Sequence, residues 1–297
     1  MAATTLSKGT LFDPSLVTDL INKVNGRSTL AVLAPQTPVP FNGSKEFTFT
    51  MDSEIDIVAE NGKKSAGGVS VEPVTILPIK FEYGARISDA FLYAAEAEQL
   101  DILRSFNDGF ARKVASGLDI AAFHGFNPRT GAASDVVGSN CFDKAVTATV
   151  TYSAATPDKG IEAAIQAVES KDCDVTGIAI APSVRADLAA MTKTSGEKLY
   201  PEFAFGGKPA TLGAQRLDIN KTVSTGNVDQ AIVGDFANRF KWGYAKEIPL
   251  EIIQYGDPDN SGKDLKGYNQ VYLRAEVYLG WAILDADAFA RVVPAAG

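Results

Sequence analysis

The feature that most constrains this chain is the stretch from residue 87 to residue 131, which has the pattern of one long amphipathic helix after a strand end. From Leu100 onward, apolar side chains recur at three- and four-residue spacing and fall on one face of a helix. They are Leu100, Leu103, Phe110, Val114, Leu118 and Ala121. The opposite face carries charged residues, several at i,i+4 spacing, so we expect it to face water. They are Asp101, Arg104, Asp108, Arg112 and Asp119.

Glycines inside and after this pattern refine the prediction. Gly109 and Gly117 each lower the stability of an isolated helix by up to ~1 kcal/mol. We therefore expect close packing along their flank, or support of the helix by tertiary contacts. The helix should end in a segment rich in helix breakers: Gly125, Asn127, Pro128 and Gly131.

The composition narrows the class of protein. The chain has 297 residues, of which 45% are hydrophobic, enough for a sizeable core. Its net charge of −8 argues against wrapping nucleic acid by neutralising phosphates, but an acidic container wall is compatible with enclosed DNA. Two cysteines, Cys141 and Cys173, and one histidine exclude a disulfide framework and a zinc ligand set. Neither a signal peptide nor an apolar run of ~18 residues is visible.

The first forty residues predict one short helix and an extended arm. The helix is expected at Pro14–Val24, with Asp13 as its N-cap. Three prolines between Leu30 and Phe41 favour extended backbone without ladder donors. Such an arm buries too little by itself, so we expect it to lie across another surface.

Alternating segments at 47–52 and 79–83 predict two strands, with 55–71 as the far end of a two-stranded ribbon. A free two-stranded ribbon is marginal in water, so it implies a partner. We expect an apolar face of the ribbon to rest on its own subunit and the tip to rest on a neighbour. That face consists of Phe47, Phe49, Ile79 and Phe81.

The second half of the chain predicts a compact subdomain and a long final strand. A capped helix with Ile161, Ala164, Ile165 and Val168 facing inward, a buried strand at 175–181 and a helix from Pro182 describe an α/β unit. Alternation from Val271 to Leu279 predicts a half-buried antiparallel strand, with Gly280 permitting a bend or bulge.

The order of these elements, together with several short motifs, resembles the major capsid proteins of tailed bacteriophages, the Hong Kong 97 fold. The motifs are Ile87-Ser88-Asp89, the helix closing on Leu118-Asp119-Ile120-Ala121, the exit from Gly125 to Gly131, Thr211-Leu212-Gly213, Gly234-Asp235 and the ending Asp285 to Val292. The resemblance covers nearly the whole chain.

The resemblance implies an α+β protein with the Hong Kong 97-type capsid fold. Its expected parts are an N-terminal arm (1–41), an extended β-hairpin loop (42–84), a peripheral domain with the spine helix and a β-sheet (85–152 and 265–297) and a compact mixed α/β axial domain (153–264). The family's terminal strand would close the peripheral sheet beside the spine helix.

The implied function is structural. The chain would be a major capsid protein that self-assembles into an icosahedral phage head enclosing double-stranded DNA, without sequence-specific binding and without a membrane. Its partners would be many copies of itself, as pentamers and hexamers, with separate scaffolding, portal and decoration proteins. It would be located in the virion capsid, after assembly in the host bacterial cytoplasm.

A search for catalytic chemistry finds no catalytic residue, no cofactor and no metal site. The G-x-S-x-G, G-x-G-x-x-G and G-x-x-x-x-G-K-[ST] motifs are absent. His124 has the position of a histidine stabilised by the helix C-terminus, the alternative being a general base. The segment Asp257 to Gly262 begins like a calcium loop, but its twelfth position is Tyr268, so we interpret it as a solvated turn.

The candidate contacts between subunits lie at the far end of the ribbon: Glu60, Asn61, Lys63 and Lys64. The lysines fit either a solvated turn or a contact with an acidic neighbour. Two alternatives to a phage capsid stay open at this point. One is an encapsulin-type compartment shell on the same fold, and the other is a small-molecule enzyme on a mixed α/β fold.

Overall fold

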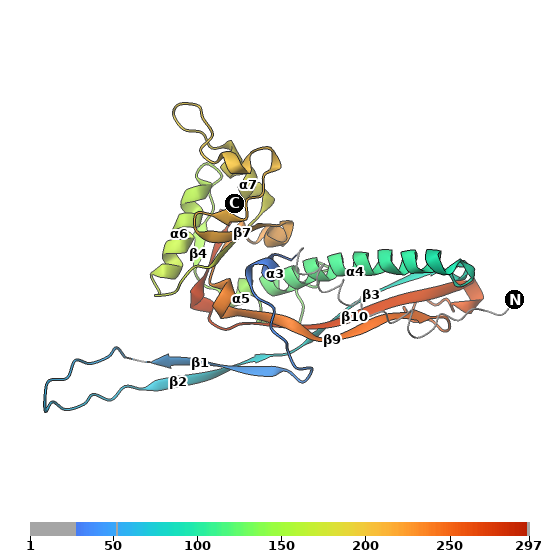
Figure 1. Ribbon diagram of the computed structural model, residues 1–297, viewed down its shortest axis with the longest axis horizontal. Coiled ribbons are helices and arrows are strands. Elements are labelled where there is room, and N and C mark those ends of the chain that lie inside the picture. Colours follow the sequence, from blue (N-terminus) through green and yellow to red (C-terminus); the bar gives the residue numbers. More distant parts are fainter. Residues whose placement is uncertain (1–27, 52, 296–297) are drawn as a thin grey trace.

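The computed structural model describes residues 28–51 and 53–295 of the protein (Figure 1). These residues form three sheets. The first is a ribbon of β1 (Ser44–Met51) and β2 (Val69–Ile76). The second has the strand order β3 (Ile79–Ser88), β10 (Gln270–Ile283) and β9 (Phe240–Ile253). The third has the order β4 (Thr149–Thr151), β11 (Phe289–Val293), β8 (Ala231–Gly234), β5 (Gly177–Ile180), β7 (Gln215–Ile219) and β6 (Thr211–Leu212).

The sheets define three parts of the molecule (Figure 1). Helix α4 (Glu96–His124) runs along the sheet of β3, β10 and β9, and together they form the long arm. The six-stranded sheet with α6 (Pro157–Glu169) and α7 (Pro182–Ala190) forms the compact body. The ribbon of β1 and β2 extends away from both. The other helical elements are α3 (Thr29–Leu33), η1 (Asp89–Tyr93), α5 (Phe142–Ala145), η2 (Pro201–Gly206), η3 (Lys221–Asn227), α8 (Phe236–Arg239), η4 (Lys266–Tyr268) and η5 (Ala286–Ala288).

Helix α4 confirms the expected long helix and its apolar stripe. Leu100 is half-buried, and the other five stripe residues are buried: Leu103, Phe110, Val114, Leu118 and Ala121. The helix ends at Gly125, whose φ of 68° is left-handed. A Cβ added there would lie 2.9 Å from the Cys141 sulfur, so the position requires glycine for space as well as for conformation.

Close packing was expected along the side of α4 that carries Gly109 and Gly117, and it is present at Gly117 only. A Cβ on Gly117 would lie 3.3 Å from the Phe81 ring, so the small residue lets β3 approach the helix. Gly109 has no such neighbour within 4 Å.

The core of the long arm lies between α4 and β10. Val114 and Leu118 of the helix belong to the same buried cluster as Val277, Leu279 and Trp281 of the strand. The predicted antiparallel strand is therefore confirmed, and it continues through Gly280 to Ile283. It is not half-buried as expected, because β10 is the central strand of its sheet and Tyr272 and Glu276 of the polar set are buried as well. A register shift against β9 falls between Tyr278 and Leu279, just before the position where a bulge was expected.

Strand pairing divides the chain differently from the expected boundaries. β9, expected in the axial domain, pairs with β10 in the long arm. β4 and β11, expected in the peripheral domain, pair with each other and β11 also pairs with β8, so both belong to the six-stranded sheet. The terminal strand thus does not close the sheet beside the long helix. Alternation along a strand identifies its buried face but not its partner strand, which explains the difference.

The ribbon also has a different second strand from the predicted one. β1 pairs with Val69–Ile76, in a register that runs from Ser44↔Ile76 to Met51↔Val69. The segment 79–83, predicted as the ribbon's second strand, instead begins β3 and pairs with β10. Ile79 and Phe81 therefore pack against the core of the long arm.

The segment before the ribbon crosses the protein's own sheet. Residues 30–33, expected to be extended, belong instead to the short helix α3. The chain then becomes extended, and the amides of Thr37 and Val39 donate to the carbonyls of Trp242 and Tyr244 at 2.8 and 3.3 Å. The predicted helix at 14–24 lies outside the described residues.

The compact body follows the predicted pattern. Ile161, Ala164 and Val168 on α6 are buried and Ile165 is half-buried, as expected. All four residues of β5 are buried, which confirms the expected buried strand. The sheet is mixed, because β5 is parallel to β7 and antiparallel to β8.

Candidate functional site

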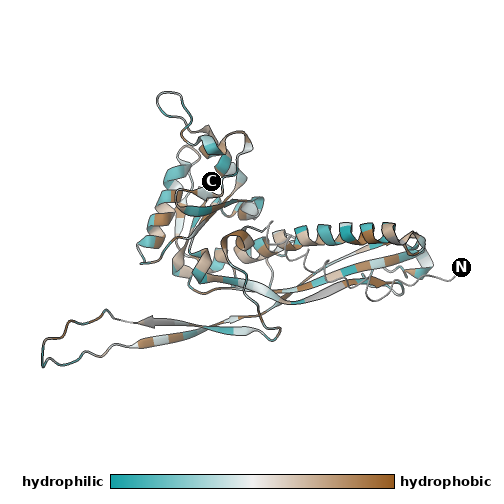
Figure 2. Cartoon of the chain, viewed as in Figure 1, coloured by the Kyte–Doolittle hydropathy of each residue, from teal (hydrophilic) through white to brown (hydrophobic). Residues whose placement is uncertain are grey.

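The ribbon carries a concentration of exposed apolar side chains among the described residues. Six side chains of β1, β2 and their connection are more than half exposed: Phe47, Met51, Ile55, Ile57, Val69 and Val71. Figure 2 shows the hydrophobic colouring along β2 and the connection. Two strands cannot bury these side chains by themselves, and a large exposed apolar patch marks an interaction surface. Phe47 was predicted to rest on its own subunit, but its side chain is 67% exposed. The side chain of Phe49 lies outside the described part.

The base of the ribbon is fixed to the long arm. Ile76 is buried with Val39 and Ala282, and the Lys241 ammonium lies 2.9 Å from the Glu46 carboxylate. A Cβ on Gly280 would lie 3.0 Å from Ile76, so the glycine of β10 admits the end of β2. The ribbon therefore leaves the body in a defined direction, with its apolar surface uncovered.

The four predicted contact residues lie together in the connection at the far end of the ribbon. Glu60, Asn61, Lys63 and Lys64 are all exposed. Asn61 has a φ of 68°, and the Gly62 amide donates to the Ala59 carbonyl at 2.8 Å, which closes a tight turn. Their contact with a neighbouring subunit stays a prediction.

Asp119 shows where the prediction of a solvated helix face was wrong. Its side chain is fully buried and faces the start of α3. The carboxylate accepts hydrogen bonds from four donors: the Ser28 hydroxyl, the Thr29 amide at 2.9 Å, the Leu30 amide at 3.2 Å and the Thr222 hydroxyl at 2.9 Å. It thus ties the N-terminal segment and η3 to the long helix.

The environment of Asp119 sets its charge. Burial raises its pKa from 3.8 to about 6, and the hydrogen bonds from Ser28, Thr29, Leu30 and Thr222 limit the increase. The carboxyl group is therefore ionised at neutral pH and neutral in mild acid. The sequence does contain a signal for this burial, because Asp119 is the only charged residue between Ala115 and Phe123.

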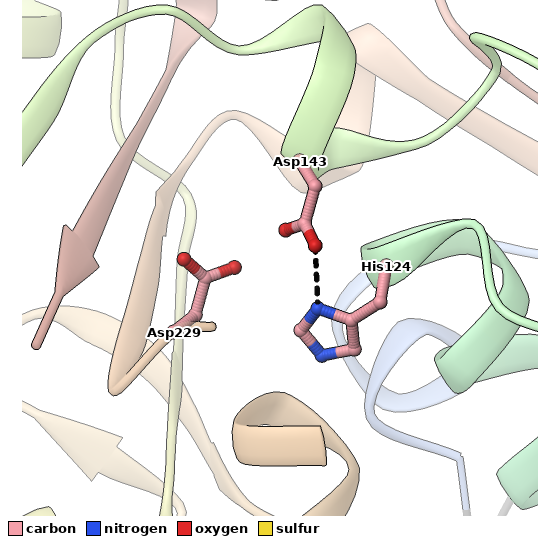
Figure 3. Close-up of side chains that lie close together, drawn as sticks. All are labelled: His124, Asp143 and Asp229. Carbon is pink, nitrogen blue, oxygen red and sulfur yellow. Dashed lines mark hydrogen bonds and ion pairs between the residues drawn. The ribbon is translucent and has the colours of Figure 1, made fainter. Parts of the chain in front are cut away.

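A second buried polar cluster lies at the C-terminal end of α4 (Figure 3). His124 donates from Nδ1 to Asp143, at 3.0 Å, and its Nε2 lies 3.0 Å from the Thr222 carbonyl. The Arg291 guanidinium reaches Asp143 and Asp229, both at 2.9 Å. The cluster joins α4, α5, η3, β11 and the segment before β8.

The partners of His124 fix its protonation state. The Thr222 carbonyl and the Asp143 carboxyl group lie at hydrogen-bond distance from the two ring nitrogens, an arrangement that favours the imidazolium, in which both nitrogens donate. Burial lowers the pKa of His124, but the hydrogen bond and the charge of Asp143 outweigh it, and the pKa is raised above 6.5. With both nitrogens bound inside the protein, neither is free to act as the general base that the sequence left as an alternative.

The same cluster offers metal-ligand atoms. One atom each from His124, Asp143 and Asp229 lie within 4.8 Å of one another. The Arg291 guanidinium already bonds both carboxylates, however, and a metal ion would have to displace this charge. Burial raises the pKa of Asp229 to about 7, and the guanidinium beside it opposes that increase. With the guanidinium and the imidazole ring already against the two carboxyl groups, the arrangement fits a structural polar network better than a metal centre.

The segment 257–262, which begins like a calcium loop, binds the side chain of Arg86 through its carboxylates. The Arg86 guanidinium lies 2.6 Å from the Asp257 carboxylate and 2.5 Å from the Asp259 carboxylate. It also donates to the Lys263 carbonyl at 2.8 Å, and the Gly262 amide donates to Asp257 at 2.7 Å. The hydrogen bond from Arg86 lowers the pKa of Asp259. Arg86 supplies the positive charge that these carboxylates need, so the geometry supports the predicted turn.

Within residues 28–51 and 53–295, no helix combines the length and the apolar character needed to cross a bilayer.

These features together define a structural protein built for association with other chains. Its buried polar clusters join distant segments of the same chain, and its apolar ribbon extends away from the folded body. The sequence profile of the phage capsid family matches residues 8–293, and the chain belongs to that family. It is a structural major capsid protein of the phage head, as the resemblance predicted.

Solved structures agree with this assignment. A chain from Mycobacterium phage Ogopogo is 34% identical, with 91% of this chain and 92% of that chain covered and a TM-score of 0.77. A chain from Gordonia phage Cozz is 26% identical, with coverages of 91% and 87% and a TM-score of 0.75. The capsid of a native GTA particle shares the fold at 16% identity, with 90% of both chains covered and a TM-score of 0.65. No curated protein matches the chain.

The matches confirm the predicted mixed helix-and-sheet capsid fold, and they favour a phage capsid over an encapsulin. They also point to a structural protein and not to the enzyme alternative.

Proposed function

We propose that many copies of this chain associate through the ribbon into a closed icosahedral head that encloses double-stranded DNA. The observation that carries the proposal is the ribbon itself, whose base is fixed and whose apolar side chains remain exposed. A second copy is the partner that is always present at high local concentration during assembly. The GTA capsid with the same fold was computed with C5 symmetry, which supports pentamers, and with them hexamers, as the building units.

The charge of the chain suits an enclosure. A net charge of −8 repels packaged DNA, so the wall confines the polymer without binding its sequence. Glu60, Asn61, Lys63 and Lys64 at the tip would supply polar contacts around the apolar ones. Assembly in the host cytoplasm, and separate scaffolding, portal and decoration proteins, belong to the same proposal.

The strand register allows a sharp test. Met51 lies opposite Val69, so residues 52–68 are replaced by Asn-Gly, a two-residue turn that closes a hairpin in this register. Residues 53–68 contribute no buried side chain, so the melting temperature followed by circular dichroism should change by less than about 2 °C. Closed particles should be lost from sedimentation profiles and electron micrographs.

Two matched variants separate the effect of the length of the connection from the effect of its side chains. A Gly-Ser connection of the same length keeps the reach and removes the side chains, and it should also prevent assembly. Lys63→Ala with Lys64→Ala keeps the apolar contacts and should weaken assembly only modestly, because exposed ion pairs contribute ~0–1 kcal/mol each. Normal shells from the deletion variant would refute the proposed role of the ribbon.

A further inference from the structure

Asparagine–glycine pairs lie at both ends of the ribbon. Asn42-Gly43 precedes β1 at the base, and Asn61-Gly62 forms the turn in the connection between β1 and β2. A further pair, Asn25-Gly26, lies outside the described residues. Asparagine is most open to deamidation before glycine, because glycine has no side chain to hinder the attack of its own nitrogen on the asparagine side-chain carbonyl.

Deamidation at the tip would replace an amide by an acid without an enzyme. The Gly62 nitrogen loses its proton to a base in the solvent and attacks Cγ of Asn61, and ammonia leaves as a cyclic succinimide forms. Water then opens the ring at either of its carbonyls. The products are aspartate and isoaspartate, in which the main chain runs through the former side chain and is longer by a methylene group. The net reaction consumes water, releases ammonia and adds a negative charge to the turn.

The geometry of the tip turn favours both residues of the pair. Asn61 has a φ of 68°, a left-handed conformation that asparagine tolerates better than most residues with a side chain. A Cβ on Gly62 would lie 2.8 Å from the Val58 side chain and 3.0 Å from the Ala59 carbonyl oxygen, so the position has little room for a side chain. The same geometry that closes the tip therefore places a reactive pair in an exposed turn.

The contacts described for the tip turn are local. The Gly62 amide donates to the Ala59 carbonyl at 2.8 Å, and the closest packing around Gly62 comes from Val58 and Ala59. Residues 53–68 are all exposed, and the pairing of β1 with β2 ends where Met51 meets Val69. Opening the turn hydrogen bond frees the Gly62 nitrogen and lets the backbone rotate toward the Asn61 side chain at little cost.

The pair at the base of the ribbon is chemically identical but packed. Asn42 is also exposed, and the Gly43 amide also donates a turn hydrogen bond of 2.8 Å. A Cβ on Gly43 would lie 2.8 Å from the Ile76 carbonyl oxygen, so β2 lies directly against this glycine. The Phe41 ring before the pair packs edge-on against Tyr278, with ring centroids 5.0 Å apart. Rotation at Asn42 has to break these contacts as well, so the base should react far more slowly.

We propose that Asn61 is a deamidation site, and that the reaction is fast in the free chain and slow in the assembled shell. The first part rests on the tip turn alone. The second part rests on the proposed function, in which a neighbouring copy covers the tip and restricts its rotation. The new charge lies next to Glu60 in a turn whose positive charges are Lys63 and Lys64, and isoaspartate lengthens the turn. The reaction therefore alters the contact surface mainly in chains that have not assembled.

Peptide mass spectrometry of one preparation tests both parts. The full-length chain is separated by sedimentation into free subunits and closed particles, and both are incubated in the same mildly alkaline buffer. In the free subunits, Asn61 should react at least roughly tenfold faster than Asn42 of the same chain, since exposed connections have the lowest opening free energies in a protein. In the particles, the reaction at Asn61 should slow by a similar factor. Chromatography should resolve aspartate and isoaspartate peptides, and the mixture identifies the succinimide route.

The variant Asn61→Gly measures the effect on assembly. Glycine adopts the left-handed conformation without strain and has no amide to lose. Free subunits are incubated and then allowed to assemble, and the yield of particles is compared with that of the same protein before incubation. The yield should fall for the wild type and stay constant for Asn61→Gly. Equal yields after incubation would contradict the effect on the contact surface.

The outcomes separate the modification site from the proposed function. Equal rates at Asn61 and Asn42 in free subunits would overturn the site and leave the capsid function intact. An unchanged rate at Asn61 inside closed particles would overturn the protection by a neighbour and leave the site intact. If no closed particles form, the proposed function and the protection fail together, and the rates in free subunits still decide the site.

Discussion

The buried carboxyl group of Asp119 makes stability depend on pH in a way that one substitution can isolate. Its pKa is raised from 3.8 to about 6 by burial, so the folded protein holds this proton more tightly than the unfolded chain. The sign follows from linkage: the stability that the protonated group contributes is complete below pH 3.8 and is lost as the pH rises toward 6. Above that value both states are ionised and the dependence ends.

The magnitude follows from the same shift. Moving from about pH 4.5 to about pH 7.5 should cost the wild-type protein about 2 kcal/mol through Asp119, part of the full ~3 kcal/mol that the shift represents. Asp119→Asn cannot titrate. The gap in stability between the two proteins should therefore change by about 2 kcal/mol over this range, or roughly 4 °C in melting temperature for a chain of this size. Other titrating groups, His124 among them, are present in both proteins and cancel in the difference.

A local measurement accompanies the global one. The Thr29 amide donates to one carboxylate oxygen and the Leu30 amide to the other, so an asparagine can accept from only one of them. Hydrogen exchange at either Thr29 or Leu30 should become faster in Asp119→Asn at neutral pH. Two results together would refute this explanation of the raised pKa of Asp119: the same pH dependence of stability in wild type and Asp119→Asn, and unchanged hydrogen-exchange protection of the Thr29 and Leu30 amides.

Two further predictions concern the core and the second polar cluster. Phe110→Ala should lower the free energy of unfolding by about 3–5 kcal/mol, and Val277→Asp should prevent folding, because both side chains lie in the core between α4 and β10. Circular dichroism is the measurement, and native-like spectra from both variants would show that this core is misplaced. The raised pKa of His124 adds stability below its ordinary pKa of 6.5 that is lost as the pH rises through the folded value. Thermal melts above about pH 6.5 should therefore decline more steeply for the wild type than for His124→Gln, and equal slopes would contradict the assignment of an imidazolium between Asp143 and Thr222.

The sequence by itself determined the elements that have a strong periodic signal. The stripe from Leu103 to Ala121 fixed the buried face of the long helix, because its period leaves one face for the core. The alternation from Val271 to Leu279 identified β10 as a strand and placed these residues in the core. The order of arm, ribbon, long helix and α/β unit was enough to indicate the capsid family. Local chemistry was equally informative at Gly125, where a left-handed residue was needed to end the helix.

Only the tertiary structure decided which partners these elements meet. The alternating segment 79–83 had the right pattern for a ribbon strand, but it pairs with β10, since a pattern of period two does not specify its neighbour. Asp119 belonged to a charged face by spacing alone, and its burial depends on Ser28 and Thr222, which are 91 and 103 residues away along the chain. These features arise from contacts between distant segments, and local periodicity carries no information about such contacts.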